Sequence, residues 1–105
     1  MSDSKLEDTL AFRLDALGIA YEREYKAIPD RKFRFDFAFP ERRLLVEVQG
    51  GTFNGGAHGR GVGIHRDYEK NNLATLAGWR VLQFDVKMIK SGEAVDKIRE
   101  ALEAQ

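Results

Sequence analysis

The feature that most constrains the fold is a pair of strand-like segments joined by a short turn, residues 33–49. Side chains on a strand alternate between the two faces of its sheet. The first segment places phenylalanines on one face and Asp36 on the other, and the second places aliphatic side chains opposite Glu47 and Gln49. With the apolar sets buried, we expect Asp36, Glu47 and Gln49 to share one surface. The expected buried set is Phe33, Phe35, Phe37, Phe39, Leu44, Val46 and Val48.

The remainder of the chain is typical of helices and strands in a definite order. We expect a helix at 4–17, a strand at 19–26, a helix at 65–77, a strand at 79–86 and a helix at 93–104, from apolar spacing and turn residues. The short connection inside 33–49 favours antiparallel pairing, whereas a strand–helix–strand crossover favours parallel pairing. The sequence therefore predicts a single α/β domain, residues 1–105, with a mixed central sheet flanked by helices.

Composition restricts the class of protein. Hydrophobic residues make up 43% of the chain and aromatic residues 10%, which is enough for a packed core. No apolar run approaches the roughly 20 residues of a membrane span, and the N-terminus, MSDSKLEDTL, lacks the apolar stretch of a signal peptide. Without cysteine there is no disulfide and no thiolate metal site. We expect a cytoplasmic domain with no membrane partner.

The charge is balanced overall but unevenly distributed. Residues 23–90 carry 13 Lys/Arg against 8 Asp/Glu, whereas the two ends together carry 4 against 9. A basic middle suits contacts with phosphate groups. Ordinary solubilising surface charge is the alternative interpretation of the same counts.

A glycine-rich stretch follows the hairpin. Residues 50–63 hold seven of the ten glycines, so this segment is either a surface loop or a backbone that closely approaches a ligand. It lacks the GxxxxGK[ST] pattern of a phosphate-binding P-loop. A nuclease site built on a metal held by His58 and His65 is a remote alternative, because this part of the chain lacks the strand–helix frame that such a site requires. Four side chains here suit phosphate contacts: His58, Arg60, His65 and Arg66.

The acids of the hairpin suit a hard divalent cation. Mg²⁺ prefers oxygen ligands and takes one or two protein carboxylates together with waters and substrate phosphate. Asp36 and Glu47 would supply carboxylate oxygens, and the backbone carbonyl of Val48 a further one, with Mn²⁺ as a substitute. Glu7 lies at the edge of the apolar face of the first helix. In the alternative interpretation the two hairpin acids pair only with neighbouring arginines: Arg34, Arg42 or Arg43.

The order of these motifs resembles that of a known family. The chain contains the run RFDFAFPERRLLVEVQGG, followed by H-x6-H, D-x2-K and GWRVLQF. This arrangement is similar to the small restriction-endonuclease-like proteins of the PD-(D/E)xK nuclease superfamily, near the very-short-patch-repair group. The resemblance spans the chain from Leu6 to about Lys90 and implies an αβββαβ core. It implies that Asp36 and Glu47 are metal ligands and that Glu7 is an added first-helix glutamate.

Gln49 departs from the family pattern, which has lysine at this position. Either glutamine is tolerated there, or Lys70 on the following helix brings its ammonium into the same space. The resemblance implies a Mg²⁺-dependent endonuclease acting on branched, mismatched or nicked DNA in repair, recombination or phage DNA processing. A catalytically inactive nucleic-acid-binding or assembly module on the same fold is the alternative. The implied catalytic residues are Glu7, Asp36, Glu47, Gln49 and Lys70.

A chain of this size offers little surface for reading a long DNA sequence, since specific modules bury roughly 600–1,000 Å² or more. Selectivity for DNA structure, a homodimer or a partner protein would compensate. RNA is the alternative nucleic acid.

Overall fold

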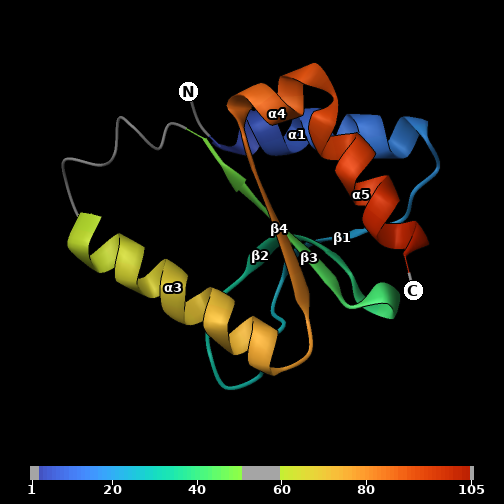
Figure 1. Ribbon diagram of the computed structural model, residues 1–105. Coiled ribbons are helices and arrows are strands. Elements are labelled where there is room, and N and C mark those ends of the chain that lie inside the picture. Colours follow the sequence, from blue (N-terminus) through green and yellow to red (C-terminus); the bar gives the residue numbers. More distant parts are fainter. Residues whose placement is uncertain (1–2, 51–59, 105) are drawn as a thin grey trace.

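A mixed four-stranded sheet lies between two layers of helices (Figure 1). The computed structural model describes the backbone of residues 3–50 and 60–104 and the side chains of residues 4–50 and 68–104. Within these ranges no helix is both long enough and apolar enough to cross a membrane. The elements in chain order are α1 (Asp3–Ala16), β1 (Glu22–Tyr25), β2 (Phe35–Phe39), η1 (Pro40–Arg42), β3 (Leu44–Gln49), α3 (Arg60–Leu76), β4 (Arg80–Asp85), α4 (Val86–Ser91) and α5 (Glu93–Glu103).

The strands lie in the order β1-β2-β3-β4. β2 pairs antiparallel with both β1 and β3, and β3 pairs parallel with β4. The β2–β3 turn is tight because Arg43 adopts a left-handed conformation with φ 52° and donates its N–H to the carbonyl of Pro40. The long crossover through α3 permits the parallel pair. The predicted α/β class, with a mixed central sheet and flanking helices, is confirmed.

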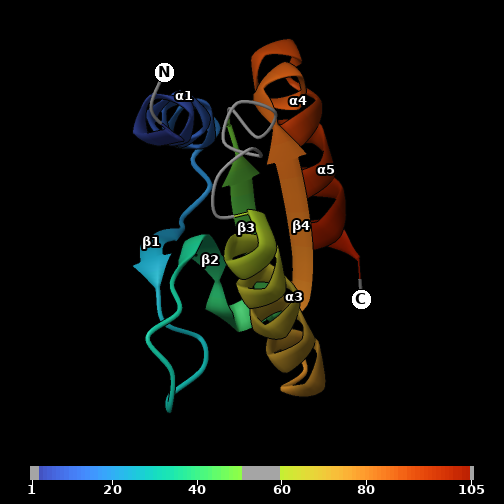
Figure 2. The same cartoon turned by 90° about the vertical axis from the view of Figure 1, so that its left-hand side faces the viewer.

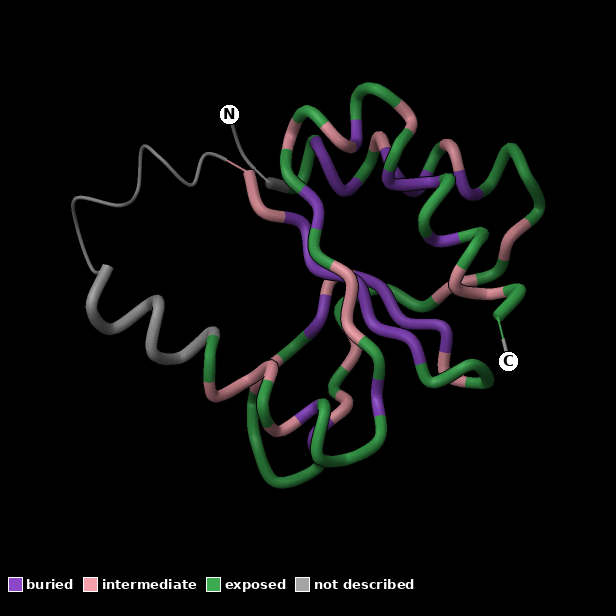
Figure 3. The backbone as a smooth tube through the Cα atoms, in the orientation of Figure 1, coloured by how far each residue is buried: buried purple, intermediate pink, exposed green. Residues whose placement is uncertain are grey.

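Two apolar clusters, one on each face of the sheet, hold the layers together, and their buried residues run along the central strands (Figure 3). In the larger cluster, α1, α4 and α5 pack against residues of β2 and β3 that include Phe37 and Val46. In the smaller one, Ala74 of α3 and Trp79 cover the other face. Figure 2 shows α3 in front of the sheet, on the opposite side from α4 and α5. Since helices cover both faces, β3 is buried continuously from Leu44 to Val48.

The predicted single face of four phenylalanines is wrong. Phe37 and Phe39 pack in the α1, α4 and α5 cluster, but Phe35 packs with Ala38 on the α3 side, and the fourth phenylalanine precedes β2. The paired register of β2 and β3 ends at Phe37 and Val46. Phe35 therefore lies beyond the pairing with β3, although it still pairs with Tyr25 of β1, and its side chain packs on the α3 face.

Helix α4 was not predicted, since the sequence analysis placed no element over residues 87–92. The Asp85 carboxylate starts this helix by accepting a hydrogen bond from the Met88 N–H at 2.9 Å. Gly92 ends it at φ 94°, where a side chain would be strained. The last strand thus leads directly into a helical layer rather than into a loop.

Candidate metal centre

The candidate site begins where β2 and β3 separate. Beyond the last paired residues, Asp36 Oδ2 accepts a hydrogen bond from the Val48 N–H at 2.7 Å, and Glu47 Oε1 accepts one from the Asp36 N–H at 3.3 Å. Each carboxylate replaces the carbonyl that a continuing strand would have offered. The two acids expected to form the site are therefore held side by side by the sheet itself.

Lys70 reaches this pair from α3. Its ammonium donates to Glu47 Oε2 and lies 4.5 Å from the centre of the Phe35 ring. The Lys70 side chain is 13% exposed and that of Glu47 is 10% exposed, so the ion pair is largely out of water. The structure thus brings the Lys70 ammonium to Glu47 from the following helix, α3.

Glu7 approaches the same end of the sheet from α1. It is 8% exposed, and its Oε1 accepts a hydrogen bond from Arg23 Nη2 at 3.1 Å. Arg23 also bonds to the exposed Asp8 at 3.1 Å and lies over the Phe37 ring at 5.2 Å. Burial of Glu7 is consistent with its predicted place at the edge of the core.

Glu24, which the sequence analysis did not include, completes the group. Carboxylate oxygens of Glu7, Glu24 and Asp36 lie within 4.8 Å of one another. Glu24 has φ 52°, an uncommon conformation for a residue with a side chain, and it interrupts the register of β1 with β2. The signal that would have found it is the alternation of IAYEREYK combined with the hairpin register, which sets Glu24 opposite Asp36.

Burial raises the pKa of Glu7 to about 7, and the negative charge of Asp36 adds to this increase while the hydrogen bond from Arg23 opposes it. Burial also raises the pKa of Asp36 to about 6, opposed by the hydrogen bond from the Val48 N–H and reinforced by the charge of Glu47. Carboxylates crowded in this way resist full ionisation because their charges repel one another in a poorly solvated space. A cation among them would remove that resistance.

The donor set fits a hard divalent ion. Carboxylate oxygens without nitrogen or sulfur ligands suit Mg²⁺ or Mn²⁺. Asp36 belongs both to the predicted set of metal ligands and to the group of three carboxylates whose oxygens lie within 4.8 Å of one another. The other two carboxylates of that group are Glu7 and Glu24. Both oxygens of Glu47 already accept hydrogen bonds. The predicted role of the Val48 carbonyl as a ligand stays a prediction. The geometry therefore favours Glu7, Glu24 and Asp36 as metal ligands and Glu47 as the partner of Lys70.

The other predicted site residues bond elsewhere or have side chains outside the described residues. Gln49 donates to Gln83 of β4 at 3.4 Å, on the side of β3 away from β2. Arg60, His65 and Arg66 lie on α3, but their side chains fall outside the described residues, and His58 lies outside them entirely.

Pairing of the hairpin acids with the neighbouring arginines is not found. Arg42 donates to the carbonyls of Leu102 and Ala104, and Arg43 donates to the carbonyl of Ala77 and lies over the Trp79 ring at 4.3 Å. Within the described side chains, the only cation paired with either acid is Lys70. The acids are therefore not part of an ordinary exposed charge network.

Comparison of the chain with models of protein families, with curated proteins and with solved structures gives no match. The function is therefore inferred from the arrangement of the clustered acids and Lys70.

The raised pKa values predict how stability depends on pH. In metal-free buffer, the folded state binds more protons than the unfolded state between the usual pKa of Glu7, 4.5, and its folded value of about 7. The free energy of unfolding should therefore fall as pH rises through this window, by on the order of 2 kcal/mol. Urea denaturation at a series of pH values with EDTA measures it. Glu7→Gln should flatten the dependence, and an equal slope in wild type and variant would contradict the assignment.

The backbone of Glu24 gives a second prediction. Glycine adopts φ 52° without steric conflict, so Glu24→Gly should stabilise the fold by about 0.5–1 kcal/mol. The same change removes a carboxylate and should weaken Mn²⁺ binding about tenfold, measured by calorimetric titration. Glu24→Gln is the matched control, because it removes the charge and keeps the strain. If Glu24→Gly bound Mn²⁺ as tightly as wild type, Glu24 would not be a ligand.

Proposed function

We propose that the chain is a Mg²⁺-dependent endonuclease of the PD-(D/E)xK superfamily that hydrolyses phosphodiester bonds in DNA in the cytoplasm. One observation carries the proposal: acids from α1, β1, β2 and β3 meet Lys70 of α3 at the point where β2 and β3 separate. Clustered acids whose pKa values are raised by burial and by neighbouring charge are typical of functional sites. The basic middle of the sequence supports a polyanionic substrate.

Each residue has a distinct task in the proposed reaction. A divalent ion held by Glu7, Glu24 and Asp36 would neutralise the scissile phosphate and acidify a water. Asp36 orients its carboxylate through the Val48 N–H, so little rearrangement is needed on binding. Glu47 fixes the Lys70 ammonium beside this cluster, where its positive charge would stabilise the negative charge that develops on the phosphate.

A second function is favoured by two contacts. Gln49 bonds to Gln83 of β4 rather than to the acids, and both oxygens of Glu47 are satisfied internally. A non-catalytic module that binds nucleic acid or joins an assembly on this fold would keep these contacts. It would bind DNA in a salt-sensitive manner without cleaving it.

Incubation of the protein with four DNA substrates distinguishes these functions: supercoiled plasmid, single strands, flaps and four-way junctions, each with Mg²⁺, Mn²⁺ or EDTA. The nuclease proposal predicts cleavage that needs the metal, with a preference for branched substrates. Binding without cleavage of any substrate supports the non-catalytic module. If the protein neither binds nor cleaves DNA, both proposals are wrong, and the same assay on RNA tests the alternative nucleic acid.

A further inference from the structure

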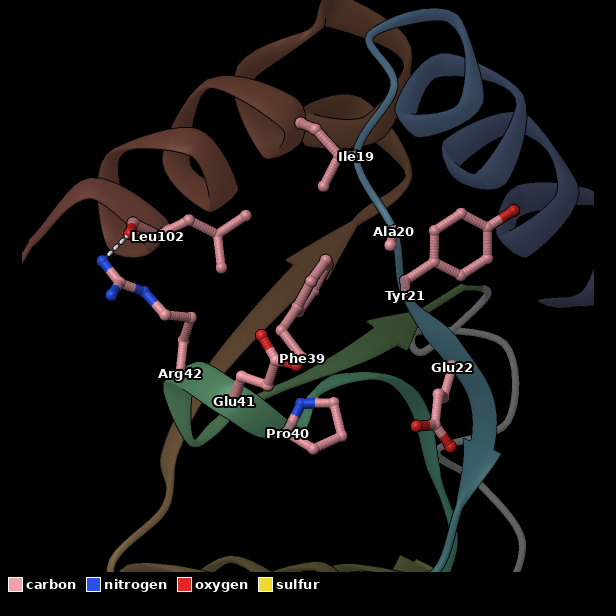
Figure 4. A pocket seen from close by; sticks show the side chains of 9 residues that line it. All are labelled: Ile19, Ala20, Tyr21, Glu22, Phe39, Pro40, Glu41, Arg42 and Leu102. Carbon is pink, nitrogen blue, oxygen red and sulfur yellow. Dashed lines mark hydrogen bonds between the residues drawn. The ribbon is translucent and has the colours of Figure 1, made fainter.

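A hollow of about 380 Å³ lies on the face of the sheet covered by α1, α4 and α5, beside the C-terminal end of α5. Figure 4 shows it between α5, η1 and the segment that leads into β1. Its apolar lining comes from Ile19, Tyr21, Phe39, Pro40 and Leu102. This volume is near the lower end of the range of small ligand pockets, and is suited to one anchoring side chain rather than a large ligand.

Two arginine side chains hold the wall of the hollow in place by donating hydrogen bonds to backbone carbonyls of the C-terminal end of the chain. Arg42 donates to the carbonyls of Leu102 and Ala104, and Arg80 donates to the carbonyl of Ala101 at 2.9 Å. These bonds satisfy the carbonyls that the end of α5 leaves without helical partners. These hydrogen bonds therefore hold the wall of the hollow in place. Arg42, the cation that lines it, already has its hydrogen-bond partners within the chain.

The rim of the hollow is acidic. Glu22 and Glu41 line it, both are exposed, and neither has an ion-pair partner among the described side chains. The apolar surface continues past Ile19 and Leu102 to a neighbouring hollow lined by Leu17, whose side chain is half exposed, and by Glu103. Arg99 lies at that farther hollow. An apolar centre with free carboxylates around it does not suit a phosphate backbone, which the acids would repel.

We propose that this hollow binds a partner polypeptide that inserts one large apolar side chain and carries lysine or arginine next to it. Such an anchor fills the pocket between Ile19, Phe39 and Leu102, while the flanking cations meet Glu22 and Glu41. Buried aromatic anchors supply most of the affinity at interfaces of this kind, and complementary charge supplies specificity. None of the three acids of the cluster, Glu7, Glu24 and Asp36, lines this hollow.

Synthetic ten-residue peptides test the proposal with isotopically labelled full-length protein. Each of the three peptides has one tryptophan near its middle. On each side of the tryptophan stand two lysines in the first peptide, two serines in the second and two glutamates in the third. We expect the lysine peptide to shift the amide resonances of Ile19, Ala20, Arg42 and Leu102 in a saturable manner. The serine peptide should bind more weakly, and the glutamate peptide should not bind.

Variants of exposed lining residues assign the binding site. Ala20→Arg places a long cation in the hollow and should weaken the lysine peptide about tenfold, and Glu41→Lys should weaken it about fivefold. Asp30→Lys, on an exposed turn away from the hollow, is the matched charge control and should leave affinity unchanged. The proposal is overturned by the absence of saturable shifts, by equal binding of the lysine and glutamate peptides, or by duplex DNA shifting the same resonances.

Discussion

Asp36→Asn is expected to abolish metal-dependent DNA cleavage, with a fall in single-turnover rate of about 10³-fold or more. Asp36 is the acid common to the predicted ligand set and to the closest oxygen group, so its charge is central to holding a divalent ion. Asparagine keeps a side-chain oxygen that still accepts the hydrogen bond from the Val48 N–H. The fold should therefore survive while the metal site is lost.

Two measurements accompany this prediction. Thermal unfolding followed by circular dichroism checks that the variant is folded, and calorimetric titration with Mn²⁺ checks the loss of metal binding. Asp30→Asn removes an exposed carboxylate from a turn and should keep wild-type activity. Wild-type cleavage by Asp36→Asn would rule out the proposed mechanism, and loss of cleavage with unchanged Mn²⁺ affinity would rule out Asp36 as a ligand.

Lys70→Met is expected to destabilise the fold by about 3–5 kcal/mol, because it leaves the charge of Glu47 buried without a partner. Methionine has a similar length and preserves packing against Phe35, so the effect reports the charge rather than a cavity. Urea denaturation gives the free energy of unfolding. Cleavage by the folded fraction should fall as well, since the ammonium beside the cluster is lost.

The double variant Lys70→Met, Glu47→Gln distinguishes electrostatic from steric effects. Glutamine is neutral and its oxygen still accepts from the Asp36 N–H, so most of the lost stability should return. Arg31→Met provides a comparison, because Arg31 lies in the β1–β2 turn and pairs with Glu69 of the same helix, α3. That pair is 45% and 37% exposed and should contribute at most about 1 kcal/mol. If Lys70→Met were no more costly than Arg31→Met, the buried pair would not be structurally important.

The direction of strand pairing is predicted well because it follows from the length of the connection between consecutive strands. The short connection at Pro40 makes β2 and β3 antiparallel, and the long crossover through α3 makes β3 and β4 parallel. Alternation fails at Phe35, where the pairing of β2 with β3 has ended and only the pairing with β1 continues, a tertiary feature that no pattern of residue types encodes. Helix α4 is missed because six residues are too few to show a helical period.

The site is predictable in part for the same reason. Asp36 and Glu47 follow from strand alternation, and Lys70 was expected on the next helix, where the structure brings it to Glu47. Glu24 could be placed opposite Asp36 only from the register of β1 with β2, and its left-handed backbone conformation has no signal in the local sequence. The raised pKa values of Glu7 and Asp36 arise from burial by distant segments and appear only once the chain is folded.

The hydrogen bonds that join β2 to β3 through Asp36 and Glu47 have a consequence for how related chains would diverge. These side chains replace missing backbone partners at the end of the sheet, so selection for folding alone is enough to retain a side-chain oxygen acceptor at both positions. Under the proposed function, a lineage that had lost cleavage would keep acids or amides at these two positions and change the residues that serve only chemistry. Drift at Glu24, which relieves backbone strain when it is replaced by glycine, would be the first mark of an inactive descendant.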